Sequence, residues 1–99
     1  MYRDDPLDDE LELRAVLGDV AVDRLAGAEA ADLLAERTPI EAAVDVLRVL
    51  QGWVDDETAA RWFLAPQRRL EDRDPITVLA AGAFEDVEEA ARIWAAAQG

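Results

Sequence analysis

Several residue types are absent from this chain of 99 residues, which contains no cysteine, histidine, lysine, serine or asparagine. The absence of cysteine excludes a disulfide framework and a thiolate metal site. Serine, cysteine, histidine and lysine are also the usual nucleophiles and near-neutral bases of enzymes. We therefore expect no catalytic residues, no metal site and no cofactor, and we do not expect an enzyme.

Carboxylates remain as possible acid–base or metal-binding groups, and they include the adjacent pairs Asp4/Asp5, Asp8/Asp9, Asp55/Asp56 and Glu88/Glu89. Sequence neighbours point in different directions on a helix, whereas general acid–base catalysis needs two carboxyls that face one substrate. The acidic stretch over residues 4–10 lacks the alternating ligands and central glycine of an EF-hand calcium loop. We interpret these carboxylates as helix caps and solvated groups.

Long apolar runs are missing as well. The longest uncharged run, residues 75–84, has ten residues, whereas a membrane-spanning helix needs about 20. The first residues also lack the apolar core of a signal peptide. We expect a cytoplasmic protein that does not enter a membrane.

Positive charge is scarce. Ten basic residues, all of them arginine, stand against 23 acidic residues, and the net charge is −13. DNA binding draws much of its affinity from cationic side chains, and anionic membranes repel an acidic protein in the same way. A positively charged pocket on another protein is the natural counterpart of such a surface.

Alanine supplies much of the apolar content. The chain is 52% hydrophobic but only 6% aromatic, and alanine is the best helix former. The composition predicts an all-α fold, a compact bundle of short helices. We divide it into a mobile acidic arm over residues 1–8, an N-terminal helical region over 9–54 and a C-terminal helical region over 55–99, packed as one compact unit.

Three helical segments are expected in the N-terminal region before residue 38. The first is capped by Asp8 or Asp9 and ends at Gly18, because glycine accepts the left-handed conformation that follows helix ends. The second is a short helix over residues 20–26 that ends at Gly27. The third segment covers residues 28–37.

The helix starts that follow are marked more clearly. Thr38-Pro39-Ile40-Glu41 predicts a capping box and a helix to Gln51. Asp55 or Asp56 caps the next helix, which ends before Pro66 because a proline disfavours helical angles in the residue before it. Asp74-Pro75 restarts a helix that closes at Gly82, and a last helix covers residues 84–97.

The three tryptophans have two interpretations each. Trp53, Trp62 and Trp94 are either core residues or interface anchors, because tryptophan is enriched at binding hot spots. We assign Trp62 to the core, with Leu64 and Pro66 fixing its position, and we leave Trp94 open.

A series of landmarks runs through the C-terminal region: Trp62, Leu64, Pro66, Leu70, Pro75, Leu79, Gly82 and Val87. This pattern resembles the toxin-binding domain of Xre/MbcA/ParS-type antitoxins, and the resemblance covers residues 58–97. Two positions depart from it. Gln67 stands where asparagine is usual, and Asp72 stands where glycine is usual.

The resemblance implies a function in which the chain binds a partner protein. Members of that family pair with RES-type toxins, which consume NAD or use it to modify a target, and their C-terminal domain obstructs the NAD pocket. The resemblance therefore implies a toxin-binding surface on the last helix and the segment before it, with these candidate contacts: Arg68, Arg69, Arg73, Arg92, Trp94, Gln98 and Gly99. The alternative for the first three arginines is pairing with the chain's own Glu71, Asp72 and Asp74.

Many relatives carry an N-terminal helix-turn-helix, and Leu17-Gly18 is interpretable as a vestige of one. Residues 19–37 offer only Arg24 and Arg37 among several acidic residues, whereas base reading needs polar or basic residues on one exposed face. We expect little or no DNA binding by this chain alone. Two alternatives stay open: a transcriptional regulator with a degenerate helix-turn-helix, and an orphan helical dimerisation module. A homodimer is expected in any case.

Overall fold

A computed structural model describes residues 6–29 and 37–98 of the chain. Six α-helices and one short 3-10 helix make up these parts, with a single isolated β-bridge and no named strand among them. The elements are α1 (Pro6–Leu17), α2 (Asp19–Glu29), α3 (Pro39–Gln51), α4 (Asp56–Leu64), η1 (Arg68–Leu70), α5 (Pro75–Ala80) and α6 (Phe84–Gln98). The all-α prediction is confirmed.

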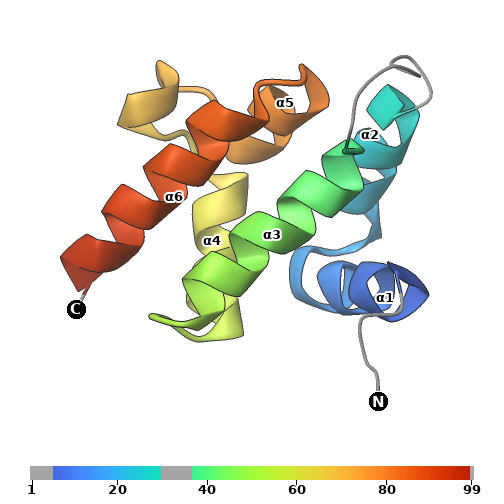
Figure 1. The fold of residues 1–99 in the computed structure, drawn as a ribbon, viewed down its shortest axis with the longest axis horizontal. Coiled ribbons are helices and arrows are strands. Elements are labelled where there is room, and N and C mark those ends of the chain that lie inside the picture. The colour runs from blue at the N-terminus through green and yellow to red at the C-terminus, as the bar shows by residue number, and fades with distance from the viewer. Residues whose placement is uncertain (1–5, 30–36, 99) are drawn as a thin grey trace.

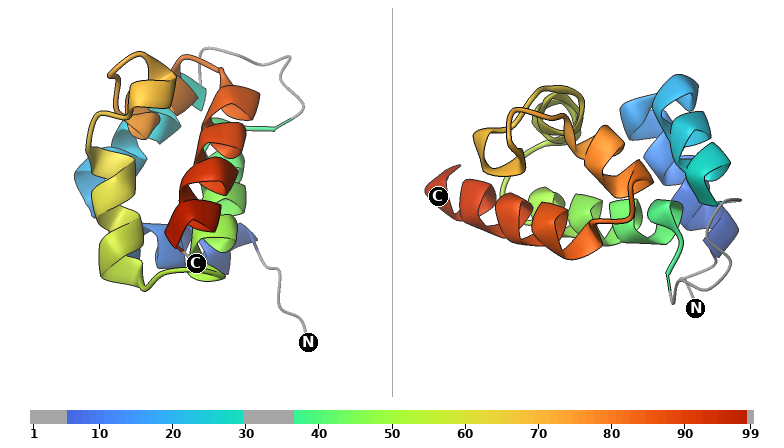
Figure 2. Two further views of the ribbon diagram at one scale, coloured as in Figure 1. Left: turned by 90° about the vertical axis from the view of Figure 1, so that its left-hand side faces the viewer. Right: turned by 90° about the horizontal axis from the view of Figure 1, so that it is seen from above.

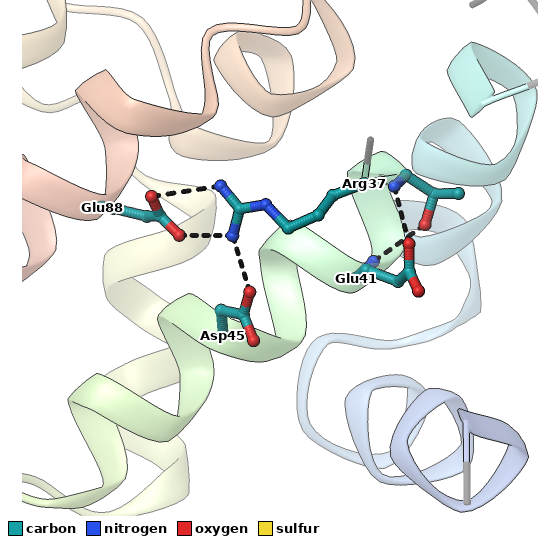
Figure 3. Close-up of polar contacts among 5 residues, drawn as sticks. Arg37, Glu41, Asp45 and Glu88 are labelled. Carbon is teal, nitrogen blue, oxygen red and sulfur yellow. Dashed lines mark hydrogen bonds and ion pairs between the residues drawn. The ribbon is translucent and has the colours of Figure 1, made fainter. Parts of the chain in front are cut away.

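Side-chain caps begin three of the helices at the predicted positions. Thr38 caps α3 with both halves of the capping box, because its hydroxyl accepts from the Glu41 N–H and the Glu41 carboxylate accepts from the Thr38 N–H (Figure 3). Asp55 caps α4 by accepting from the Thr58 N–H. Asp74 caps α5 by accepting from the Thr77 N–H. These bonds satisfy amide groups that a helix start leaves unpaired.

The N-terminal helices differ from the prediction. Helix α1 begins at Pro6, earlier than the expected cap at Asp8 or Asp9. Gly18 ends it with a φ of +90°, as expected. Helix α2 then continues through Gly27 to Glu29 instead of ending at Gly27. A glycine inside a helix costs only about 1 kcal/mol relative to alanine, so the good helix formers Ala26 and Ala28 carry the helix across it.

Two parts of the prediction lie outside the described residues. These are residues 1–5 of the expected acidic arm and residues 30–36 of the expected third segment.

The core lies where the helices of both regions meet. Helices α3 and α6 lie side by side along the molecule, and α4 crosses behind them (Figures 1 and 2). Helix α1 packs on α4, and α2 packs on α5, so the N-terminal and C-terminal regions share one core. The Cα radius of gyration is 12.6 Å, about the value expected for 100 residues in one compact domain.

Helix α3 is the central element of this core. It buries one apolar face, which consists of Ile40, Ala43, Val44, Leu47 and Leu50. Helix α6 buries mainly small residues against its neighbours, namely Val87, Ala90, Ala91 and Ala95. Small side chains let helix backbones approach closely, so α6 can pack on α3 with few large side chains. None of the described helices has the length and apolar character to cross a membrane.

Candidate partner-binding surface on the link and the last helix

The link, residues 67–73, joins α4 to α5 as a closed turn around η1. The Gln67 N–H donates to the Arg73 carbonyl at 3.1 Å. The Gln67 carbonyl in turn accepts from the Leu70 N–H at 3.0 Å and from the Asp72 N–H at 2.9 Å. Leu70 is 2% exposed and anchors the turn in the core. The link is therefore an ordered turn that packs against α6.

Gln67 joins the link to the end of α4. Its side-chain amide donates to the Trp62 carbonyl at 2.9 Å and to the Ala65 carbonyl at 3.2 Å. The last carbonyls of a helix have no partner inside the helix, so the Gln67 amide supplies one. This departure from the usual asparagine thus has a structural role at the start of the link.

Two residues of the link adopt left-handed backbone angles. Glu71 has a φ of 60° and Asp72 has a φ of 63°. Such angles cost roughly 1 kcal/mol for a residue that carries a side chain. Asp72 is the position where the resembled pattern has glycine, and the positive φ gives a physical reason for glycine at this point.

Most of the landmark residues are structural. Trp62, Leu70, Pro75, Leu79 and Val87 are buried, and Gly82 has a φ of +92°. Pro66 is exposed, and Ala65 before it has an extended conformation with a ψ of 149°, as predicted.

Leu64 is the exception among the landmarks, because half of it is exposed. It therefore does not fix Trp62, and that part of the prediction is wrong. Two residues along a helix correspond to about 200° of rotation, so Leu64 faces away when Trp62 faces the core. Trp62 instead contacts Phe63 edge to face at 5.6 Å between ring centroids and Trp94 at 6.1 Å.

The three tryptophans have different environments. Trp62 is 3% exposed and belongs to the core, as predicted, whereas Trp53 is 54% exposed. Trp94 is partly buried against the core and Trp62. Among the other candidate contacts, Gln98 is exposed and its amide donates to the Trp94 carbonyl at 3.1 Å. Gly99 lies outside the described residues.

The candidate arginines fall into two groups. Arg68, Arg69 and Arg92 are exposed and form no ion pair with any residue that the structure describes. Arg73 instead bonds the Glu71 carboxylate at 3.3 Å and the Leu70 carbonyl at 3.2 Å. The alternative interpretation, pairing within the link, therefore holds for Arg73 among the three link arginines.

In the part of the N-terminal region that the structure describes, the arginines form ion pairs between helices. Arg48 on α3 bonds Asp9 and Glu12 on α1, each at 2.9 Å. Arg14 on α1 lies within 3.2 Å of carboxylates on both α1 and α2. Arg24 on α2 donates to the Thr77 hydroxyl at 2.7 Å. Bonds to Arg48 and Gln51 lower the pKa of Glu12. These side chains neutralise part of the acidic charge inside the molecule.

Arg37 forms a further cluster, which joins α3 to α6. Its guanidinium donates to Glu88 on α6 at 2.7 and 3.3 Å and to Asp45 on α3 at 2.6 Å (Figure 3). It also lies 5.6 Å from the centre of the Phe84 ring. The Arg37 hydrogen bonds lower the pKa of Glu88, and the two carboxylates raise the pKa of Arg37.

No local pattern in the sequence predicts the Arg37 cluster. Glu88 lies 51 positions after Arg37, and no local spacing rule links such distant residues. The pair follows only from the packing of α6 on α3.

Comparison of the chain with family models, curated proteins and solved structures finds no match. Among the described residues, no group of three or more acidic, histidine or cysteine side chains is placed to hold a metal ion.

Proposed function

We propose that this chain is the antitoxin of a type II toxin–antitoxin system, a cytoplasmic protein that binds a RES-type toxin and obstructs its NAD pocket. The proposal originates in the resemblance carried by residues 58–97. The observation that supports it best is the set of exposed arginines without internal ion pairs on the link and α6: Arg68, Arg69 and Arg92.

These three exposed arginines differ from the ion-paired arginines elsewhere in the described residues, and this difference supports the proposal. In a chain of net charge −13, an exposed arginine has many acidic residues available for pairing. The N-terminal arginines use them, whereas the exposed arginines of η1 and α6 do not, and η1 packs on α6. Guanidinium groups pair carboxylates in fork geometry. These arginines are therefore suited to acidic groups on a partner protein.

Because most of the landmark residues are buried, other residues make the contacts with the partner protein. Side chains such as Leu70 and Val87 are in the core and cannot meet a partner. They hold the link and α6 in place, and the exposed residues of those two elements make the contact. Trp94 takes part through its accessible edge.

DNA binding has less support. A regulator with a degenerate helix-turn-helix requires arginines on one exposed face. Arg14, Arg24, Arg37 and Arg48 are instead engaged by side chains of this chain. A specific nanomolar complex with its own promoter at low salt would favour the regulator over the antitoxin.

The test is co-purification with the RES-type toxin encoded beside this chain's gene. We expect a stable complex in which NAD consumption by the toxin is suppressed. The double variant Arg68→Ala/Arg69→Ala should weaken the complex at least about tenfold, as expected when two charged contacts at an interface are lost. Arg61→Ala is the matched control, because Arg61 is exposed and, among the described residues, pairs only with exposed Glu57 on its own helix.

The role of the C-terminal end is best tested with a short truncation. Ala95 is fully buried and Trp94 contacts Trp62, so deletion of residues 92–99 would damage the core as well as the surface. Deletion of residues 96–99 spares both side chains. If the toxin stays bound and inhibited without these residues and without Arg92, they are not the blocking elements.

We also propose that the chain forms a homodimer. Two chains of charge −13 repel each other, and salt screens this repulsion. Sedimentation in low and high salt should therefore show a dimer that is more stable in high salt. A monomer at all salt concentrations would exclude a dimer and also the orphan dimerisation module.

A further inference from the structure

The start of α6 lacks the kind of cap that begins its neighbours. Helices α3, α4 and α5 each begin after a threonine or aspartate whose side chain accepts from a backbone N–H. Helix α6 begins at Phe84, directly after Ala83. An alanine side chain has no hydrogen-bonding atom, so it cannot satisfy the free N–H groups of the first turn. The first turn of α6 therefore has no side-chain cap from the residue that precedes it.

Arg37, which lies just before α3, makes side-chain contacts with the first two turns of α6. Its guanidinium faces Phe84, the first residue of α6, and bonds both oxygens of Glu88 one turn later. The same group bonds Asp45 on α3, so one side chain joins α3 to the first two turns of α6 (Figure 3). Glu88 is only 18% exposed and Arg37 34% exposed, so solvent screens this cluster less than a fully exposed ion pair.

The contacts of α6 with the rest of the core do not duplicate this role. They come mainly from alanine and from one aromatic contact near its other end, between Trp94 and Trp62. Small apolar side chains pack closely but have no directional bonds, so they define the rotation and register of a helix less strictly than a bidentate ion pair does. The register of α6 on α3 is thus best defined at Arg37.

We propose that Arg37 is a positioning residue: by fixing the start of α6 on α3, it sets the orientation of the helix that presents Arg92 and Trp94. The functional half of this inference, which concerns the binding of a partner, rests on the proposed function. The structural half, which concerns the position of α6 on α3, does not. Arg37 does not touch the partner. It acts through Glu88 and Asp45.

Hydrogen exchange of the free, full-length chain tests the structural half. In the Arg37→Ala variant we expect the amides of residues 88–95 to exchange about tenfold faster, the change that corresponds to loss of a charged hydrogen bond. Arg48→Ala is the matched control, because Arg48 also bonds two carboxylates but joins α1 to α3. Equal acceleration of residues 88–95 in both variants would overturn the proposal.

A second substitution separates positioning from general loss of stability. Ala83→Ser places a capping hydroxyl before α6, and in the Arg37→Ala background it should return exchange of residues 88–95 towards the wild-type rate. Arg37→Lys keeps the charge but loses the fork that bridges Asp45 and Glu88, so we expect an intermediate rate. A lysine variant as fast as the alanine variant, with no rescue by the new cap, would contradict the assignment.

The functional half is tested by affinity for the RES-type toxin at a temperature where every variant is folded. A purely structural residue would leave the dissociation constant of the folded molecules unchanged, whereas we expect Arg37→Ala to raise it about tenfold and Arg48→Ala to leave it within about twofold. An unchanged constant in Arg37→Ala overturns the functional half. If the wild-type chain does not bind the toxin at all, the proposed function fails, and the exchange experiment still decides whether Arg37 positions α6.

Discussion

Gly27 and Gly82 have opposite backbone requirements, although both were expected to end helices. Gly82 has a φ of +92° at the turn between α5 and α6, whereas Gly27 lies within α2. The sequence could identify both as glycines near a helical pattern. It could not show that α2 continues, because that depends on the burial of Leu25 and its neighbours in the shared core.

The first prediction compares alanine at these two positions. A Cβ at Gly27 would meet nothing within 4 Å, so Gly27→Ala should raise the free energy of unfolding by about 0.5–1 kcal/mol. Gly82→Ala should lower it by about 1–2 kcal/mol, because the left-handed angle is strained for alanine. Urea denaturation measures both. If Gly27→Ala destabilised the chain, α2 would not continue through this residue.

The second prediction concerns the left-handed turn of the link. Asp72→Gly should stabilise the chain by up to about 1 kcal/mol, since glycine adopts a φ of 63° without strain. Asp86→Gly removes the same charge from the first turn of α6 and should be destabilising, because glycine is a poor helix former. Thermal denaturation of the two variants separates backbone strain from charge. Equal shifts in both would show that charge alone matters.

For whole helices, local sequence rules predicted where a helix starts better than they predicted the contacts between helices. Thr38, Asp55 and Asp74 cap α3, α4 and α5 as their sequence neighbours indicate, because a cap depends on residues within one turn. The closed turn of the link was not predicted, since its closure depends on the bond between Gln67 and Arg73 across the turn. The Arg37 cluster needs the packing of α6 on α3 and was not predictable.

The third prediction uses the pH dependence of that cluster. The folded state lowers the pKa of Glu88, mainly through the Arg37 hydrogen bonds. A lowered folded-state pKa gives a stability contribution that is fully present above the unfolded pKa, about 4.3 for glutamate, and is lost as the pH falls through the lower folded value. Glu88→Gln should therefore be less stable than wild type at pH 7, by about 1–2 kcal/mol, and the difference should shrink below about pH 4.

Glu89→Gln is the control for that experiment. Glu89 is the exposed neighbour of Glu88 and forms no ion pair with the described residues, while its substitution changes the net charge equally. Chemical denaturation at pH values from about 3 to about 8 should show a pH-dependent stability difference from wild type only for Glu88→Gln. The same difference for both variants would attribute the effect to net charge.

For the molecule as a whole, composition was sufficient to predict an all-α bundle with one core. Alanine content indicated helices, and the capping residues indicated where several of them start. The exposure of individual side chains and the ion pairing of arginines were harder to predict from the sequence. Leu64 was expected to fix the position of Trp62 and is half exposed. The division of arginines into paired and unpaired groups depends on contacts between helices that are distant in the chain.

The charge distribution of the whole molecule indicates how the chain would bind a partner protein. The positive groups left unpaired among the described residues lie on η1 and α6, next to a surface that is otherwise acidic. An acidic protein with a local basic surface can meet a partner of mixed charge, and electrostatic complementarity then fixes the orientation of the complex.

The most direct test of the proposed function is NAD binding by the RES-type toxin with and without a stoichiometric amount of this chain. Obstruction of the pocket predicts that the chain raises the apparent dissociation constant for NAD at least about tenfold, and that the Arg68→Ala/Arg69→Ala variant does so less. Calorimetric titration of NAD into the toxin and into the complex measures this. If NAD binds the complex as tightly as it binds the free toxin, the chain does not act by occluding the pocket.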